Sequence, residues 1–170
     1  MVVVMNKTME DPKSYIVKRS RELFIRGFHC SQAVFMATSE VFGFDEREII
    51  PVIRSLAPFG GGMGSTGNIC GCLSGAIAVF GFIWGKNKPE DRDQRPMWRF
   101  SYKMVKKFES ITSQYGGIEC RSIVNINWSS REEIKAFRSG QDGKRQRCLD
   151  VIEKTCLVVF ELLVKELRAK

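Results

Sequence analysis

The spacing of hydrophobic positions along the chain predicts helices almost throughout. Apolar residues recur at roughly helical spacing between Tyr15 and Phe24, which is typical of a helix with one buried face. Asp11 and Pro12 precede this segment, and an N-cap residue followed by proline favours a helix start. The helix is expected to end at Gly27, because glycine commonly follows the last helical residue.

The same pattern predicts further helices, separated by glycines and short polar stretches. They are expected over residues 30–43, 45–56, 68–85, 97–111, 130–137 and 148–167. Ser130 and Glu133 form a capping-box pattern, and Pro51 either begins the regular part of its helix or kinks it. Residues 120–128 are expected to be irregular with one helical turn. Because strand-like alternation is sustained nowhere, the prediction is a compact all-α bundle with a glycine-rich loop before a buried central helix.

The length of 170 residues favours one domain over residues 1–170, with residues 1–9 as a flexible N-terminus. The opening run MVVVM is too short for a signal peptide. The most apolar window, residues 69–85, is shorter than the ~20 residues needed to cross a bilayer. A cytoplasmic protein without membrane insertion is therefore expected.

The net formal charge is +8, which permits binding to nucleic acid or to an anionic surface. The lysines and arginines are scattered along predicted helix faces, and no block of them is interleaved with aromatic residues. A surface that follows a phosphate backbone would need such a block. The charge therefore favours a solvated basic surface, and nucleic acid is not the expected partner.

Six cysteines are the main candidates for chemistry in this sequence. In a reducing compartment they are not expected to form permanent disulfides, and clustered cysteines there more often hold a metal or take part in redox chemistry. The sequence lacks the two close C-x-x-C pairs of a structural zinc finger. Cys156 lies in an apolar helical stretch and is expected to belong to the core.

Residues 60–75, GGGMGSTGNICGCLSG, place seven glycines around two cysteines. Residues 62–67 match the G-x-G-x-x-G pattern of dinucleotide-binding loops, but the preceding residues are helical rather than a strand. No acidic residue follows at the required distance after a strand, and the Lys-Ser/Thr ending of a P-loop is missing. The glycines are therefore expected to bring backbone close to something that the cysteines hold, rather than to wrap a phosphate.

Cys70 and Cys72 lie near the start of the predicted central helix, where the positive end of the helix favours thiolate. Residues i and i+2 point about 200° apart on a regular helix. One of the two is therefore expected to face a site and the other to pack, unless the turn is irregular. Cys30 lies at another predicted helix start, Cys120 in a probable loop, and Cys148 at or near the start of the last helix.

Cys30 in HCSQAV, the glycine stretch 60–75, Cys120 and Cys148 together resemble the C-GCAxxG-C-C family of redox-active proteins. That family has four characteristic cysteines and a CGAxxG core behind a GGG-x-G loop. The resemblance covers about residues 28–160, and it agrees in cysteine order, glycine loop and spacing.

The core of that family matches this chain at Cys70, Gly71 and Gly75, with one departure. Cys72 stands where the family has alanine, and it could add a ligand, a resolving thiol or only a slightly larger packing residue. The family is similar to a domain of split-Soret cytochromes, in which an iron–sulfur centre accompanies haem. Covalent haem is not expected here, because the chain has no C-x-x-C-H.

The resemblance implies one site built from distant thiols. The expected ligands of an iron–sulfur cluster or another thiolate-bound metal are Cys30, Cys70, Cys72, Cys120 and Cys148, and the expected catalytic thiols are Cys70 and Cys30. The glycines expected at the cofactor site are Gly62, Gly64, Gly67, Gly71 and Gly75. Glycine lets backbone turn tightly and approach closely, so that N–H groups can point at sulfur, although the same glycines could simply allow tight helix contact. His29 could ligate a metal or tune Cys30, or be an ordinary exposed or satisfied histidine.

Three functions follow from these residues. The first is a redox-active protein that holds an iron–sulfur cluster or another thiolate-bound metal for electron transfer or sensing. The second is a metal-free thiol–disulfide oxidoreductase, and the third is a basic helical adaptor with structural cysteines. The sequence does not name a redox partner, and an apolar helix face could pair two copies into a homodimer.

Overall fold

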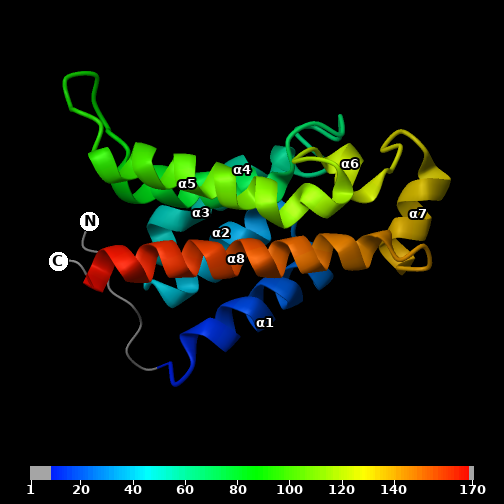
Figure 1. The fold of residues 1–170 in the computed structure, drawn as a ribbon, viewed down its shortest axis with the longest axis horizontal. Helices are drawn as coiled ribbons and strands as arrows, with labels where there is room; N and C mark the ends of the chain where they lie inside the picture. The colour runs from blue at the N-terminus through cyan, green and yellow to red at the C-terminus, as the bar shows by residue number, and fades with distance from the viewer. Residues whose placement is uncertain (1–8, 169–170) are drawn as a thin grey trace.

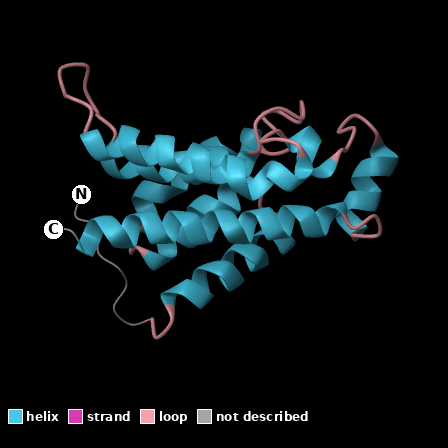
Figure 2. Ribbon diagram, viewed as in Figure 1, coloured by secondary structure: helices cyan, strands magenta, loops and turns pink. Residues whose placement is uncertain are grey.

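The protein, described by a computed structural model over residues 9–168, is built from eight α-helices and two short 3-10 helices in that range. The elements are α1 (Pro12–Ile25), α2 (Cys30–Val41), α3 (Glu46–Leu56), η1 (Ala57–Phe59), α4 (Gly71–Trp84), α5 (Arg95–Thr112), η2 (Ser113–Tyr115), α6 (Cys120–Val124), α7 (Arg131–Ser139) and α8 (Lys144–Arg168). Figure 1 shows an elongated bundle along α8, with α6 and α7 at one end. Figure 2 shows helices joined by loops. Residues 9–168 contain no strand, and the predicted all-α fold is confirmed.

Helices α2 and α4 form the buried centre of the bundle. Ten of the twelve residues of α2 and nine of the fourteen residues of α4 are buried, as expected for helices that are apolar on most sides. These two helices pack against each other, and α8 packs against α1, α2 and α5. The glycine-rich loop between η1 and α4 therefore leads directly into the core, as predicted.

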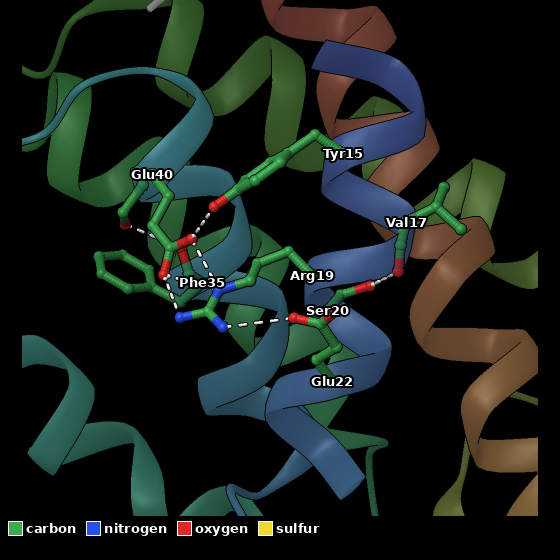
Figure 3. A network of polar contacts seen from close by, with 8 residues as sticks. Tyr15, Val17, Arg19, Ser20, Glu22, Phe35 and Glu40 are labelled. Carbon is green, nitrogen blue, oxygen red and sulfur yellow. Dashed lines mark hydrogen bonds and ion pairs between the residues drawn. The ribbon is translucent and has the colours of Figure 1, made fainter. Parts of the chain in front are cut away.

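A polar network joins α1 to α2 on the side of the bundle (Figure 3). Arg19 donates from Nε to Glu40 Oε2 at 2.8 Å and from Nη2 to Glu40 Oε1 at 3.0 Å. The hydroxyl of Tyr15 donates to the same carboxylate at 2.7 Å. A bidentate arginine–carboxylate pair fixes geometry as well as adding energy. The network thereby fixes how α1 lies on α2, and with it the turn that leads into Cys30.

The helix caps follow the sequence closely. The carboxylate of Asp11 accepts from the N–H of Ser14 at 3.0 Å, as predicted for the start of α1. Ser130 Oγ accepts from the N–H of Glu133 at 3.2 Å. The other half of the predicted capping box does not form, because the Glu133 carboxylate accepts from the N–H of Asn127 at 3.0 Å.

Two helices begin at positions other than those predicted. Helix α4 begins at Gly71 rather than near Asn68, because residues 68–70 pair in extended form with residues 118–120. Helix α8 begins at Lys144, whose N–H donates to the carboxylate of Asp142 at 3.0 Å. Cys148 therefore lies in the second turn of α8, near its start as predicted. Residues 120–128 contain one short helix, α6, in agreement with the prediction.

The predicted flexible N-terminus, residues 1–9, lies outside the described residues except for Met9. Met9 is partly buried and packs against the core. Among the helices that the structure describes, none combines the length and the apolar character that a membrane span requires. This agrees with the expectation from residues 69–85.

Candidate functional site

A cavity of about 440 Å³ lies at the end of the bundle that carries α6 and α7. Its wall is formed by the end of α1, the α1–α2 turn, the glycine-rich loop, α6, α7 and the start of α8. Cys30, Cys70, Cys120 and Cys148 all line it. Four cysteines from widely separated segments are thus gathered at one place, as the resemblance implied.

The thiol groups of Cys30, Cys70 and Cys72 form a hydrogen-bonded cluster beside this cavity, with Cys30 and Cys70 in the cavity wall. Cys70 and Cys72 hydrogen-bond to Cys30, and these bonds lower the pKa of Cys30 well below that of an ordinary thiol. The backbone N–H of Ser31 and the charge of His29 act in the same direction, against the effect of burial. Because hydrogen bonds to sulfur favour the charged form, Cys30 is the thiol that loses its proton first.

The pKa values of Cys70 and Cys72 move in the opposite direction. Their hydrogen bonds to Cys30 raise both values well above the ordinary range, and burial adds to this. The backbone N–H of Cys72 bonds to the sulfur of Cys70 and partly offsets the rise. Of the three thiols, Cys30 therefore ionises most readily, and Cys70 and Cys72 act as its hydrogen-bond donors.

Cys70 and Cys72 both face this cluster, contrary to the expectation that one would pack elsewhere. Cys70 is the N-cap residue of α4, with φ −59° and ψ 132°. Its backbone is extended rather than helical, so the rotation of 100° per residue does not apply between the two positions. The turn between Cys70 and Cys72 is therefore irregular, which is the condition under which both thiols were expected to serve one site.

Two glycines of α4 allow Cys30 to come this close. A Cβ added at Gly71 would lie 2.6 Å from Cys30 Sγ and 2.8 Å from the backbone oxygen of Phe59. A Cβ added at Gly75 would lie 2.3 Å from the backbone oxygen of Ser31. Since no side chain fits at either position, α2 and α4 can touch backbone to backbone beside the thiols. The two predicted effects of these glycines, close helix contact and access to sulfur, occur together.

The glycine-rich loop is closed by its own backbone hydrogen bonds. Its N–H groups donate to backbone oxygens within the loop and in η1, including Gly64 to Pro58 at 2.6 Å and Gly67 to Gly61 at 3.0 Å. Left-handed φ values occur at Gly61, Gly62, Gly64 and Gly67, and also at Met63 and Ser65. The N–H groups of Met63, Gly64, Ser65 and Gly67 are thus used within the loop and η1, and they are not free to cradle a phosphate.

The five glycines that were predicted at the cofactor site do not line the cavity, because the glycines in its wall are Gly27, Gly60 and Gly61. They support the segments that form the wall. At Gly62 an added Cβ would lie 2.7 Å from Cys120 Cβ, so this glycine lets the loop touch Cys120. Gly67 accepts from the N–H of Arg121 at 2.9 Å. Gly62 and Gly67 thus hold α6 against the loop, while Gly64 has open space around its α-carbon.

Cys120 and Cys148 form the other side of the cavity and remain protonated. Burial raises the pKa of Cys120 to about 12. Burial also raises the pKa of Cys148 well above the ordinary range, and the charges of Cys30, Cys70 and Cys120 raise it further. Both are therefore poor nucleophiles in this state.

Cys156 has the core position that was predicted for it, and His29 is exposed beside Cys30. Cys156 is fully buried in the core, and burial raises its pKa to about 12. His29 is the exposed N-cap residue of α2, and its ring packs against Gly60. Its charge favours the Cys30 thiolate, so it tunes that thiol.

Sequence reasoning missed three polar residues of the cavity: Trp128, Arg138 and Arg145. Trp128 lies between α6 and α7, Arg138 in the last turn of α7, and Arg145 in the first turn of α8. Their spacing follows no motif, and in sequence they resemble ordinary residues of amphipathic helices. Only the approach of α7 and α8 to α1 identifies them.

The donor set has the chemistry of a thiolate metal site, but its arrangement does not fit one. Within residues 9–168, no group of three or more His, Cys, Asp or Glu side chains is arranged so that it could hold a metal ion. Cys120 and Cys148 make no hydrogen bond to the Cys30 cluster in this range. The cysteines are gathered around a space rather than directed to one point.

Comparison with known proteins gives one match. The model of a family described as "putative redox-active protein (C_GCAxxG_C_C)" matches residues 28–162. No curated protein and no solved structure matches the chain. The matched range contains all six cysteines and all the residues named above as lining the cavity except Gly27.

Proposed function

The chain belongs to the C_GCAxxG_C_C family of redox-active proteins, and on this basis we propose that it carries out thiol–disulfide exchange in the cysteine-lined cavity. Cys30 is the attacking thiol and Cys70 the resolving thiol. The observation that carries the proposal is that Cys30 and Cys70 line the same cavity, where hydrogen bonds from Cys70 and Cys72 lower the pKa of Cys30.

The six cysteines differ in a way that suits this chemistry. The pKa of Cys30 is lowered, whereas burial or hydrogen bonding raises the pKa of the other five. The thiolate is the form that attacks a disulfide. Cys30 and Cys70 both line the cavity, so a substrate held there meets the attacking and the resolving thiol.

The exchange proceeds in two steps. The Cys30 thiolate attacks one sulfur of a disulfide R–S–S–R, forming a Cys30–S–S–R bond as the first R–S⁻ leaves. Cys70 then gives its proton to the departing sulfur and attacks Cys30 Sγ, so that a Cys30–Cys70 disulfide forms and R–SH leaves. The substrate disulfide is reduced by two electrons, and the two cysteines are oxidised by two. An external dithiol restores both thiols by the reverse exchange.

Mapping of the cysteine pairs after reaction with a disulfide tests this scheme. We expect limited oxidation by glutathione disulfide to give a Cys30–Cys70 disulfide, identified by peptide mass spectrometry. In Cys70→Ser the mixed disulfide on Cys30 should accumulate, because the resolving thiol is missing. Cys156→Ala is the matched control and should behave as the wild-type protein. Modification of Cys148 alone, with Cys30 left reduced, would contradict the proposal.

A thiolate-bound metal or iron–sulfur cluster is the second candidate, favoured by the four cysteines around one cavity of about 440 Å³. Four thiolates are the usual donor set for [2Fe–2S] and [4Fe–4S] clusters and for zinc. As the side chains lie, no three of the described ligand-type residues are directed at one metal ion, so binding would require them to move. We therefore place this candidate after thiol exchange.

Metal removal separates the two candidates. Thiol exchange requires no metal, so we expect Cys30 to keep its reactivity after exhaustive chelation under anaerobic conditions. Anaerobic reconstitution with iron and sulfide provides the opposite test. The cluster would be the better proposal if the reconstituted protein bound stoichiometric iron and acid-labile sulfide. This binding should then be lost in Cys30→Ser and Cys148→Ser but kept in Cys156→Ala.

A further inference from the structure

The polar side chains of the cavity wall give it a positive charge, which thiol exchange by itself does not require. Among residues 9–168, no aspartate or glutamate lines the cavity, whereas Arg138 and Arg145 both do. The rest of the wall is largely apolar and includes Phe24, Phe28 and Phe137. Because an apolar wall lowers the local dielectric constant, a fixed positive charge acts there more strongly than on an open surface.

Within the described part of the chain, neutral groups hold Arg145 in place. Its Nη1 donates to the backbone oxygen of Arg138, and its Nη2 donates to the backbone oxygen of Ile25 at 3.4 Å. The guanidinium also lies 5.7 Å from the centre of the Phe24 ring. These contacts fix its position between α1, α7 and α8 without neutralising its charge, and a guanidinium has five N–H groups in all.

Neither arginine is paired with a carboxylate in the part of the chain that the structure describes. The ion pairs there involve Lys13, Arg19, Arg21, Arg99, Lys106 and Arg121 as the cations. Arg138 is exposed, and Arg145 is partly buried. Two uncompensated guanidinium groups therefore lie at the same cavity, one at its surface and one farther in.

Trp128 gives an independent indication of a ligand. Its Nε1 is buried and, among residues 9–168, has no hydrogen-bond partner other than the sulfur of Cys120. This hydrogen bond lowers the pKa of Cys120, although burial outweighs the effect. Sulfur is a weak acceptor, and a poorly satisfied buried N–H is costly. An oxygen acceptor of a ligand in the cavity would satisfy it better.

We propose that the cavity binds a small thiol that carries a carboxylate, or its disulfide, with Arg138, Arg145 and the Trp128 indole N–H as the groups that recognise the ligand's anionic and polar atoms. The volume of about 440 Å³ lies within the usual range for small-molecule pockets. This inference rests on the proposed function, since it names the substrate class for exchange at Cys30. The carboxylate fixes the ligand, and its sulfur faces the thiolate.

The test compares two disulfide reagents that differ in charge. The probes are 5,5′-dithiobis(2-nitrobenzoate), which is anionic, and 4,4′-dithiodipyridine, which is neutral at pH 7. We expect the ratio of their rates at Cys30, anionic over neutral, to exceed the ratio for free cysteine by about tenfold at low salt. The amount by which the ratio for Cys30 exceeds the ratio for free cysteine should decrease with added salt, because part of the arginine charge is exposed and is screened by ions.

Variants of the two arginines should remove this preference. In Arg138→Gln and Arg145→Gln the ratio should fall about fivefold to tenfold, and Arg145→Lys should keep part of it because the charge remains. Arg92→Gln is the control. It removes an exposed arginine in the α4–α5 connection, at the end of the bundle opposite to α6 and α7 (Figure 1), and should leave the ratio unchanged.

The outcomes separate this inference from the proposed function. An unchanged ratio in both glutamine variants, with Cys30 still reactive toward both reagents, overturns the anion site and leaves thiol exchange standing. A Cys30 that reacts no faster than free cysteine with either reagent overturns thiol exchange. Calorimetric titration with 2-nitrobenzoate, which has no thiol, then still measures the anion site. Saturable binding that weakens in Arg138→Gln supports the site, and no binding to the wild-type protein rejects it.

Discussion

Replacing Cys30 by serine is expected to lower the rate of thiol alkylation of the native protein at pH 7 by about 100-fold. A free thiol with a pKa of about 8.5 is only a few per cent ionised at this pH. The pKa of Cys30 is lowered by hydrogen bonds from Cys70 and Cys72, so a larger fraction of it is thiolate at this pH than of a free thiol. Burial holds Cys120 and Cys156 at pKa values of about 12. These thiols cannot replace Cys30 as the nucleophile.

The pH dependence of alkylation by iodoacetamide measures this effect directly. Because the pKa of Cys30 lies below that of a free thiol, the wild-type rate should reach half of its maximum at a pH below about 8.5. The rate should decrease only when the pH passes the lowered pKa of Cys30. Cys156→Ala, which removes an unreactive buried thiol, should give the wild-type profile. A wild-type rate that falls tenfold for each pH unit below about 8.5 would show that Cys30 is an ordinary thiol.

Replacing Gly75 by alanine is expected to destabilise the protein by about 2 kcal/mol or more. The added Cβ would lie 2.3 Å from the backbone oxygen of Ser31 and 3.0 Å from its Cα. Neither atom belongs to a flexible side chain, so α2 and α4 must separate at the centre of the core. Ser31 follows Cys30 directly, and the separation should therefore also weaken the hydrogen bonds that hold the Cys30 thiolate.

Gly81 provides the matched control in the same helix. An alanine Cβ there meets no atom within 4 Å, and alanine is favoured over glycine inside a helix by about 1 kcal/mol. Gly81→Ala should therefore raise the free energy of unfolding while Gly75→Ala lowers it, as measured by guanidinium titration. For a chain of this size, a loss of 2 kcal/mol corresponds to a decrease of about 4–8 °C in Tm. Equal stability of the two variants would contradict the close contact between α2 and α4.

The helices were predictable because the interactions that define them are local. The Asp11 cap depends on Ser14, three residues away, and the Ser130 cap on Glu133. The apolar character of residues 69–85 placed the central helix in the core. The predicted start of α4 was wrong because a distant segment changes the local structure. Residues 118–120 pair with residues 68–70, so that α4 begins later in the sequence.

The candidate thiols were also identified from the sequence, through the order of Cys30, Cys70, Cys120 and Cys148 around the glycine stretch. Their individual properties were not. The lowered pKa of Cys30 depends on thiols 40 and 42 positions away. Similarly, the reason for glycine at position 71 is the sulfur of Cys30, at 2.6 Å from the place of its missing Cβ.

By itself, the sequence determined that this protein is an all-α bundle with a buried helix behind a glycine-rich loop, and which cysteines to examine. Helical periodicity and capping act over three or four residues, so they can be recognised in any single segment. Only the tertiary structure decided which cysteine is the thiolate, that Cys72 faces it, and that Arg138 and Arg145 meet at the same cavity. These properties arise from distances between helices, and such distances depend on packing of the whole chain.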